Sequence, residues 1–328
     1  MIRSVTDRLV KSYTEVPEDL VSRLRSGRVN GYPVEVRSPW DENVPATLET
    51  FLQAFREMHS KWLGLVNKSP VVAFEIRRST PGSLRFQYIV PTKRLERKLR
   101  TQLTNQAPKI GFATGETGIP VSEGDSVGGG VLTPGRKDCY PFQTQFNEPP
   151  INAVASILHR HAMQDTRFVI QLLFKPVVGE PVRDWWWRRN AFQRISYLKK
   201  DKAGALPWHD RSATSRERSQ ADMIEAKAGA SNYKTCIRFL VIGADSHTSS
   251  RVKELSGGFN VFENPETGQY FDTVTVSHFR EKPFLNFAEA VADKRFDGAP
   301  QFRTSTRELA ALVSVPSIKQ KNINYSQP

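Results

Sequence analysis

The sequence predicts an α+β protein made of two ferredoxin-like (split βαβ) units, with helices on one face of antiparallel or mixed sheets. Three observations support this fold class. Apolar residues alternate on both sides of a Pro-Gly turn at 81–82, a basic helix with one apolar stripe follows, and the order helix, strand, strand, helix, strand occurs twice. The two copies share this order without residue-level identity.

The first unit, predicted over 47–113, centres on a hairpin that leads into a helix. An earlier helix is expected over 47–65, because its apolar residues follow the spacing of one helical face: Leu48, Phe51, Leu52, Phe55, Met58 and Trp62. The hairpin strands alternate with period two, with Val72, Phe74 and Ile76 before the turn and Leu84, Phe86, Tyr88 and Val90 after it. Thr92 is placed to cap a helix carrying Leu95, Leu99 and Leu103, and 109–113 is predicted as the closing strand.

The second unit is predicted over 151–280. It comprises a helix over 151–163, buried strands over 167–178 and 233–243, a short helix over 249–259, a closing strand over 260–262 and one more strand over 270–279. An insertion over 179–232 separates its first two strands. Within the insertion, Phe192, Ile195 and Leu198 have helical spacing, 209–220 is polar and expected to be mobile, and 223–229 is predicted as a short helix.

Segments outside the two units are predicted to play smaller parts. Residues 1–46 form an arm packed on the body, with a short strand over 34–37 at a sheet edge. Residues 114–150 are rich in glycine and proline, so we expect a loop or linker that buries little. Residues 281–328 hold a C-terminal helix, begun by a capping box with Ser305 as N-cap and Glu308 at N3, and then a linker-like tail.

Composition limits the class of protein. The chain has 328 residues, 38% of them hydrophobic, enough for one large or two small globular domains. Its net charge of +13 indicates an anionic partner, whether nucleic acid, an acidic protein surface or anionic lipid, with plain solubility as the alternative. Cys139 and Cys236 are too few for a disulfide framework, and reduced thiols are expected. Because no apolar window could span a bilayer and no signal peptide is visible, we expect a location in the cytoplasm, or at the inner face of the membrane.

The sequence contains no recognisable catalytic motif. Gly130–Asp138 has the glycines of a P-loop, but Arg136 stands at the lysine position and Lys137 at the hydroxyl position. His159 and His161 are two residues apart on a predicted helix, so they point to different faces and do not form a zinc pair. We therefore expect no enzymatic activity, cofactor or metal in this chain.

Two groups of residues are candidates for binding. Basic side chains of the helix after the hairpin and of the insertion could hold phosphates, or could simply form solvated helix faces: Lys93, Arg94, Arg97, Lys98, Arg100, Arg188, Arg189, Arg194, Lys199 and Lys200. Three adjacent indoles, Trp185, Trp186 and Trp187, could stack on single-stranded nucleic acid, contact a membrane or anchor a protein interface. The protein interface is favoured, with Leu309 and Leu312 of the C-terminal helix as further contacts.

Several stretches resemble a known family. They are VVAFEIRR with LRFQYIVP, TRFVIQLLFKP, Ala226–Ala228 leading to YKTCIRFLVIG, and TSTRELAALVSVPS. Together they resemble the N-terminal, non-motor domain of conjugation and type IV secretion ATPases, which are related to the HerA–FtsK DNA translocases. The pattern from Thr306 to Pro316 looks like the segment that leads from that domain into the motor.

The resemblance implies a non-catalytic accessory module for assembly or substrate presentation. The motor residues of the family have no counterparts in this chain, so the expected partner is a P-loop ATPase or motor domain encoded elsewhere, or the chain is a fragment of one. DNA, a membrane-bound secretion complex and further copies of the chain are the other implied partners. Two alternatives stay open: a stand-alone basic nucleic-acid-binding protein, and a peripheral membrane component anchored by Trp185–Trp187.

Overall fold

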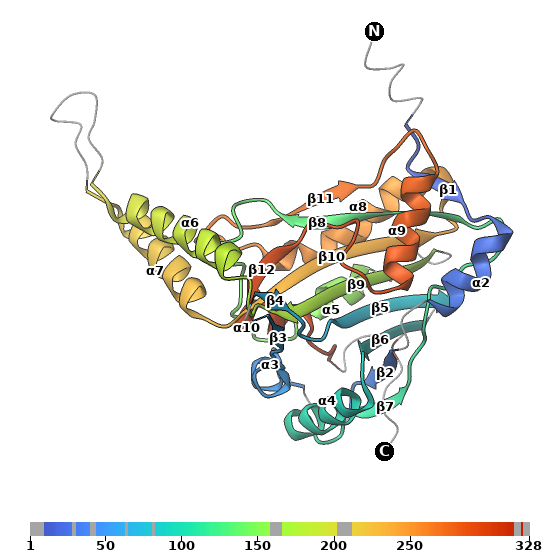
Figure 1. Ribbon diagram of the computed structural model, residues 1–328, viewed down its shortest axis with the longest axis horizontal. Coiled ribbons are helices and arrows are strands. Elements are labelled where there is room, and N and C mark those ends of the chain that lie inside the picture. The colour runs from blue at the N-terminus through green and yellow to red at the C-terminus, as the bar shows by residue number, and fades with distance from the viewer. Residues whose placement is uncertain are drawn as a thin grey trace, which may run out of the picture.

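One large antiparallel sheet organises the fold (Figure 1). The computed structural model describes residues 10–27, 31–39, 44–62, 65–80, 83–157, 166–201, 212–317 and 323. Within them the sheet has the strand order β1-β8-β10-β9-β5-β6-β2-β7, while β11 also pairs with β8 and β12 with β10. The strands are β1 (Tyr13–Glu15), β2 (Tyr32–Arg37), β5 (Val72–Thr80), β6 (Ser83–Val90), β7 (Gly111–Thr114), β8 (Ser126–Pro134), β9 (Arg167–Pro176), β10 (Asn232–Ile242), β11 (Phe271–Thr275) and β12 (Phe302–Ser305). The predicted α+β class is confirmed at this level.

Helices pack against both faces of this sheet. The helices of the described residues are α2 (Glu18–Ser26), α3 (Glu49–Phe55), α4 (Lys93–Gln106), α5 (Ile151–Ile157), α6 (Pro181–Lys199), α7 (Ser215–Gly229), α8 (Thr248–Gly257), α9 (Lys282–Ala292) and α10 (Thr306–Leu312), with 3₁₀ turns η3 (Asp245–His247) and η4 (Gly258–Phe262). Of these, α6 and α7 pack on each other in a separate core. Successive strand residues point to opposite faces. Phe239 of β10 joins the core formed with α3, α4, α5, α8 and α10, whereas Leu240 joins the core formed with α2 and α9. The expectation of helices on one face only is therefore wrong.

Two strands come from segments that were expected to lie outside the sheet core. β2, from the predicted N-terminal arm, lies between β6 and β7 and is not an edge strand. β8, from the predicted loop or linker, pairs with β10 and is buried over most of its length. Its glycines make this possible, because a Cβ on Gly129 would lie 2.1 Å from the carbonyl oxygen of Phe239. A glycine-rich strand can thus pack where backbone and helices approach closely.

Several predicted boundaries are corrected. α3 ends at Phe55 instead of reaching residue 65, because Arg56 turns to an extended ψ of 126°, and Met58 and Trp62 are exposed. Residues 258–262 form a 3₁₀ turn and not a closing strand. Of the polar stretch 209–220, which was expected to be mobile, residues 215–220 form the start of α7, and the N-cap Thr214 makes a capping box with Glu217. Residues 209–211 lie outside the described residues. Short strands β3 (Ser60–Lys61) and β4 (Val66–Asn67) pair beyond α3.

The local signals at helix starts are confirmed. The Thr92 side chain accepts a hydrogen bond from the backbone N–H of Leu95, and Ser305 and Glu308 form the predicted capping box of α10. The helix α9 was not predicted, although Phe284, Phe287, Ala288 and Val291 carry helical spacing and are buried. Three predicted features lie outside the described residues: the Pro-Gly turn at 81–82, the end of the predicted helix at 158–163 with its histidines, and the tail residues 318–322 and 324–328.

Candidate interaction surface

The insertion forms a helical hairpin, α6 and α7, that projects from the sheet between β9 and β10 (Figure 1). Pro181 stands at the first helical position of α6, where the missing N–H costs nothing. The two helices pack through small and aliphatic side chains: Ala191, Ile195 and Leu198 of α6 against Ala221, Ile224 and Ala228 of α7. Cys139 and Tyr140, from the segment after β8, complete this small core. The hairpin is therefore a packed element with its own apolar centre.

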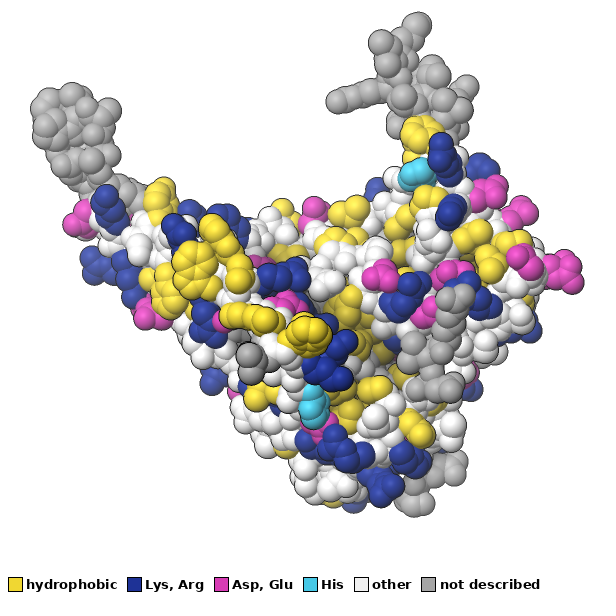
Figure 2. Space-filling view, in the orientation of Figure 1, with side chains coloured by type: hydrophobic (Ala, Val, Ile, Leu, Met, Phe, Trp, Pro, Cys, Tyr) yellow, Lys and Arg dark blue, Asp and Glu magenta, His cyan; other side chains and the backbone are white. Residues whose placement is uncertain are grey.

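The outer side of α6 leaves large apolar side chains in solvent. Trp185 and Trp186 are 53% and 52% exposed, and Val182, Phe192 and Tyr197 are also exposed on this helix. The guanidinium of Arg189 lies 5.1 Å from the Trp185 ring and 5.3 Å from the Trp186 ring. Figure 2 shows hydrophobic side chains gathered on the projecting arm, with Lys and Arg around them. We call the five exposed residues with Arg189 the aromatic face of α6.

Trp187 differs from its two neighbours. Its Nε1–H donates to the Asp138 carboxylate at 2.8 Å, and the Arg303 guanidinium lies 4.5 Å from its ring. It packs on the small core of the hairpin. Of the three adjacent indoles, Trp187 thus packs against the protein, while the other two are exposed. Helical geometry requires adjacent residues to point in different directions, but the sequence motif alone does not show which of the three packs against the protein.

Ion pairs hold the base of the hairpin on the sheet. The Asp184 carboxylate pairs with Arg188 at 2.8 Å and with Arg303 of β12 at 2.6 Å, and Glu180 pairs with Lys234 of β10 at 2.5 Å. Burial alone would raise the pKa of Asp184, but hydrogen bonds from Arg188 and Arg303 outweigh it and hold the pKa below its ordinary value. The same balance, with Lys234 as the donor, lowers the pKa of Glu180. Both carboxylates are therefore charged at neutral pH.

A fully buried ion pair holds the C-terminal end of α7 on the body of the protein. The Lys227 ammonium donates to Oε1 of Glu308 at 2.9 Å, and both side chains are buried. The same oxygen accepts the backbone N–H of Phe142 at 2.8 Å, while Oε2 accepts the Ser305 N–H at 2.6 Å. One carboxylate thus joins α7, α10 and the segment after β8.

The predicted basic helix, α4, is largely neutralised by carboxylates. Arg94 makes two hydrogen bonds to Glu57, at 2.8 and 2.6 Å, and Lys98 reaches the same carboxylate at 3.4 Å. Burial opposes the charged form of Glu57, but these two cations lower its pKa below the ordinary value. On the other side, Glu96 pairs with Lys93 at 2.5 Å and with Arg100 at 2.9 Å, and the hydrogen bond from Lys93 is the main cause of its lowered pKa. Arg97 is exposed.

The basic residues of the hairpin are also mostly engaged. Besides its pair with Asp184, Arg188 donates to the carbonyl of Ala228 at 3.0 Å. Arg194 donates to the Tyr140 hydroxyl, and Lys199 pairs with Asp222 and Glu225, each at 3.0 Å. Lys200 is exposed at the end of α6. The predicted nucleic-acid residues therefore lie on two separate elements and carry less free charge than the sequence suggests.

Leu309 and Leu312 are not surface contacts. Both are buried in the main core, where α10 packs against α3 and β12. The prediction that they belong to a protein interface is wrong. An amphipathic helix near the end of a sequence looks the same whether its apolar side meets a partner or the body of the protein itself.

A row of polar residues that the sequence analysis did not identify crosses the sheet on the α9 side. Five adjacent strands place one polar residue each in register: Glu35 of β2, Gln87 of β6, Glu75 of β5, Gln171 of β9 and Arg238 of β10. All five are buried. The sequence signal was a polar residue flanked by apolar residues in each strand, but only the register reveals that the five side chains are neighbours.

Members of the polar row hydrogen-bond to one another, to α9 and to neighbouring residues such as Arg77 and Glu116. Gln171 donates to Glu75 at 2.6 Å and to the carbonyl of Val291 at 2.9 Å, and Arg238 donates to the carbonyl of Ala290 at 2.6 Å. These carbonyls belong to the last turn of α9, whose C=O groups have no N–H donors within the helix itself. Burial lowers the pKa of Arg238 to about 10, so it stays charged at neutral pH. The row thus joins α9 to the sheet.

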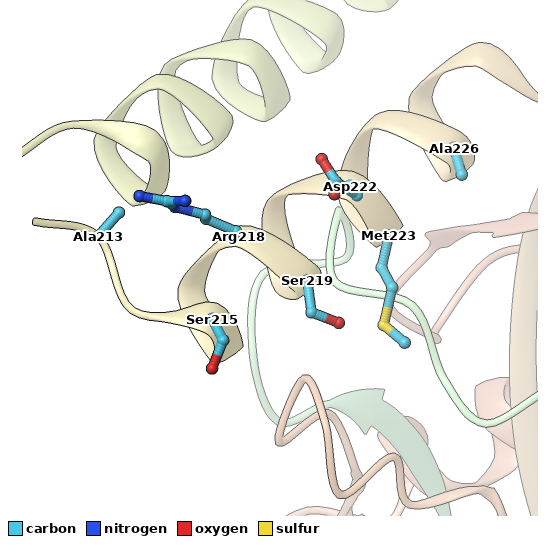
Figure 3. A pocket seen from close by; sticks show the side chains of 7 residues that line it. All are labelled: Ala213, Ser215, Arg218, Ser219, Asp222, Met223 and Ala226. Carbon is cyan, nitrogen blue, oxygen red and sulfur yellow. The ribbon is translucent and has the colours of Figure 1, made fainter.

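An open pocket of about 690 Å³ lies beside α7. Figure 3 shows the seven side chains that line it. Ser215, Ser219 and Met223 point to one side of α7, while Arg218 and Asp222 point to the other (Figure 3). Because its polar groups do not converge, this pocket does not have the layout of a small-molecule site.

Two further observations concern the described part of the chain. No group of three or more His, Cys, Asp or Glu side chains in these residues is arranged to hold a metal ion. No helix among them is long and apolar enough to cross a bilayer.

Fold and surface together define an α+β protein with a large antiparallel sheet and a projecting helical hairpin. Residues 6–328 match the family described as Domain of unknown function (DUF8128), and the chain belongs to that family. No curated protein matches the chain.

Proposed function

We propose that the chain is a non-catalytic docking module and that the aromatic face of α6 binds a partner protein. The observation that carries the proposal is the exposure of Trp185 and Trp186 beside Arg189, on a helix whose other side is packed. Tryptophan, tyrosine and arginine are the residue types that most often dominate the energy of protein interfaces. The ion pairs at the base of the hairpin would keep this face in a fixed orientation, which lowers the entropy cost of binding.

The partner we propose is the P-loop ATPase of a DNA-translocating, conjugation or type IV secretion-like system. The support is the resemblance of the strands and of the Thr306–Pro316 segment to the non-motor domain of such ATPases. In this role the chain contributes to assembly or substrate presentation, and hydrolysis belongs to the partner. A membrane-bound secretion complex or a further copy of the chain is the alternative occupant that the experiment below distinguishes.

We further propose that the sheet consists of two ferredoxin-like units joined edge to edge. The first unit runs along the chain as β2, α3, β5, β6, α4, β7, and its strands lie in the sheet in the order β7-β2-β6-β5. The second runs as β8, α5, β9, β10, α8, β11, and its strands lie in the order β11-β8-β10-β9. Each is the fourth-first-third-second arrangement of a split βαβ unit. The two units would meet at β5 and β9, and the hairpin would be an insertion into the second unit alone.

The tagged chain, used as bait in a nuclease-treated lysate of the native source, tests the docking role. We expect a P-loop ATPase to be recovered by the wild-type chain and lost with the Trp185→Ala/Trp186→Ala variant, since each ring at an interface centre contributes about 2 kcal/mol or more. Trp62→Ala is the matched control, because Trp62 is an indole exposed at least as much as the other two and remote from the hairpin in sequence. Equal recovery of the ATPase by all three chains would contradict the proposal. Loss of binding to anionic vesicles, or of self-association, in the double variant would identify a membrane or a second copy instead.

Nucleic-acid binding is the second candidate, and the net charge of +13 favours it. Because Arg94, Lys98 and Arg100 are paired with carboxylates, we expect only weak, strongly salt-dependent binding of single- or double-stranded DNA. The Arg97→Ala/Lys98→Ala/Arg100→Ala variant should change the affinity by less than about threefold in a filter-binding series at rising salt. A loss of more than about tenfold would favour the nucleic-acid function over the docking module.

A further inference from the structure

A second concave site lies on the sheet face that carries α9, away from the hairpin. It is a pocket of about 490 Å³, within the size range of small-molecule sites. Its lining includes Val71, Ala73, Ile89, Lys294, Arg295 and Phe296. Ala73 of β5 and Ile89 of β6 belong to one buried apolar cluster with Leu173 and Cys236, and Val71 and Phe296 pack against that cluster. The body of the pocket is therefore apolar.

Lys294, which lines this pocket, combines a cationic side chain with a strained backbone conformation. The backbone N–H of Lys294 donates to the Val291 carbonyl at 3.2 Å, and that of Arg295 donates to the Ala290 carbonyl at 3.0 Å. This is the Schellman arrangement at the end of α9, and it places Lys294 at the left-handed C′ position with φ of 52°. Glycine is the usual residue there, because a side chain at this φ costs about 1 kcal/mol. A strained non-glycine residue in a pocket suggests a functional role.

The ammonium of Lys294 retains hydrogen-bonding capacity. The residue is only 8% exposed, and its Nζ donates to the Ala292 carbonyl at 2.8 Å, which uses one of its three N–H bonds. The neighbouring acids are engaged with Arg295, whose guanidinium pairs with Asp293 at 3.5 Å and with Asp297 at 2.9 Å. Within the described residues, no carboxylate forms an ion pair with Lys294. Burial lowers the pKa of Lys294, and the charges of Arg77 and Arg238 act in the same direction, while the carboxylates of Glu75 and Asp293 oppose the shift without forming an ion pair.

We propose that this pocket binds a small amphipathic acid, with the apolar body over Ala73 and Ile89 and the anionic group on Lys294. A neutral apolar ligand would leave the buried ammonium without an ion-paired anion, and a strongly polar ligand would leave the apolar floor uncovered. One apolar body with one anionic group satisfies both requirements. The proposal does not depend on the docking role of the hairpin, because no residue of α6 or α7 lines the pocket.

Two fluorescent dyes test this assignment in the full chain. Anilinonaphthalenesulfonate carries an apolar ring system and one anion, and phenylnaphthylamine is its neutral relative. We expect the wild-type chain to bind the anionic dye with one-to-one stoichiometry and more tightly than the neutral dye. Both Lys294→Met and Lys294→Gly should lower the affinity for the anionic dye about tenfold or more, because a hydrogen bond to a charged group is lost. The affinity for the neutral dye should change little.

Matched variants separate the pocket from the rest of the surface. Val71→Trp should block both dyes by filling the pocket, whereas Lys253→Met, at an exposed lysine of α8, should change neither. Lys294→Gly should unfold at the same temperature as the wild type or higher, because glycine relieves the left-handed strain, so its loss of binding would not reflect unfolding. Unchanged affinity for the anionic dye in Lys294→Met would overturn the proposal, as would binding that Val71→Trp leaves intact but Trp185→Ala/Trp186→Ala removes.

Discussion

Replacing Glu308 with alanine is expected to lower the free energy of unfolding by about 3–5 kcal/mol, the usual loss when one partner of a buried ion pair is removed. The change leaves the Lys227 ammonium buried without its carboxylate, and it also removes the acceptor of the Phe142 and Ser305 backbone N–H groups. The capping box of α10 is lost at the same time. Urea unfolding followed by circular dichroism measures the loss.

Two further variants make the Glu308 experiment specific. Glu225→Ala removes an exposed carboxylate that pairs with Lys199, and it should change the free energy of unfolding by less than about 1 kcal/mol. The Lys227→Met/Glu308→Leu double variant should recover part of the loss, because no unpaired charge stays buried. If Glu308→Ala unfolds at the wild-type urea concentration, the buried pair does not join the hairpin to the body in the way we describe.

The polar row predicts the second large effect. Three donors converge on the Glu75 carboxylate: Arg77 at 3.3 Å, Gln87 at 2.8 Å and Gln171 at 2.6 Å. Glu75→Gln keeps the shape of the side chain, but one of its two acceptor oxygens becomes a donor and the charge facing Arg77 disappears. We expect a loss of about 3 kcal/mol in the free energy of unfolding, from an unsatisfied buried donor and a broken buried pair.

Glu35→Gln is the control for this prediction, because it makes the same chemical change at the end of the same row. Among the described residues, Glu35 accepts one side-chain hydrogen bond, from Arg37 at 2.9 Å, so a loss of about 1 kcal/mol is expected. Thermal or urea unfolding of the two variants gives the comparison directly. Equal losses at the two positions would show that the row is not a connected network centred on Glu75.

Local signals in the sequence predicted much of the fold. Alternation around 81–82 predicted β5 and β6, and side-chain capping chemistry placed the starts of α4 and α10 at Thr92 and Ser305. These features depend on neighbours within a few residues, so a sequence pattern contains the information. The start of α7 had a capping signal of the same kind, in Thr214 and Glu217, inside a stretch whose polarity favoured a mobile segment.

Features set by distant partners were not predicted. A glycine-rich strand such as β8 resembles a linker until Phe239 and the helices around it are in place. The basic face of α4 resembles a phosphate-binding surface until Glu57, which lies outside that helix, reaches Arg94 and Lys98. Nor does the motif of three tryptophans reveal that Trp187 is an anchor, since its partners Asp138 and Arg303 are far away in the sequence.

The docking role of the hairpin is the central claim, and a titration of the recovered ATPase, purified, with three forms of the chain tests it most directly. Isothermal titration should give the same dissociation constant for the wild type and Trp62→Ala, and one raised by about thirtyfold or more for Trp185→Ala/Trp186→Ala, with unchanged thermal unfolding of all three. If the double variant binds the ATPase as tightly as the wild type, the aromatic face of α6 is not the docking surface.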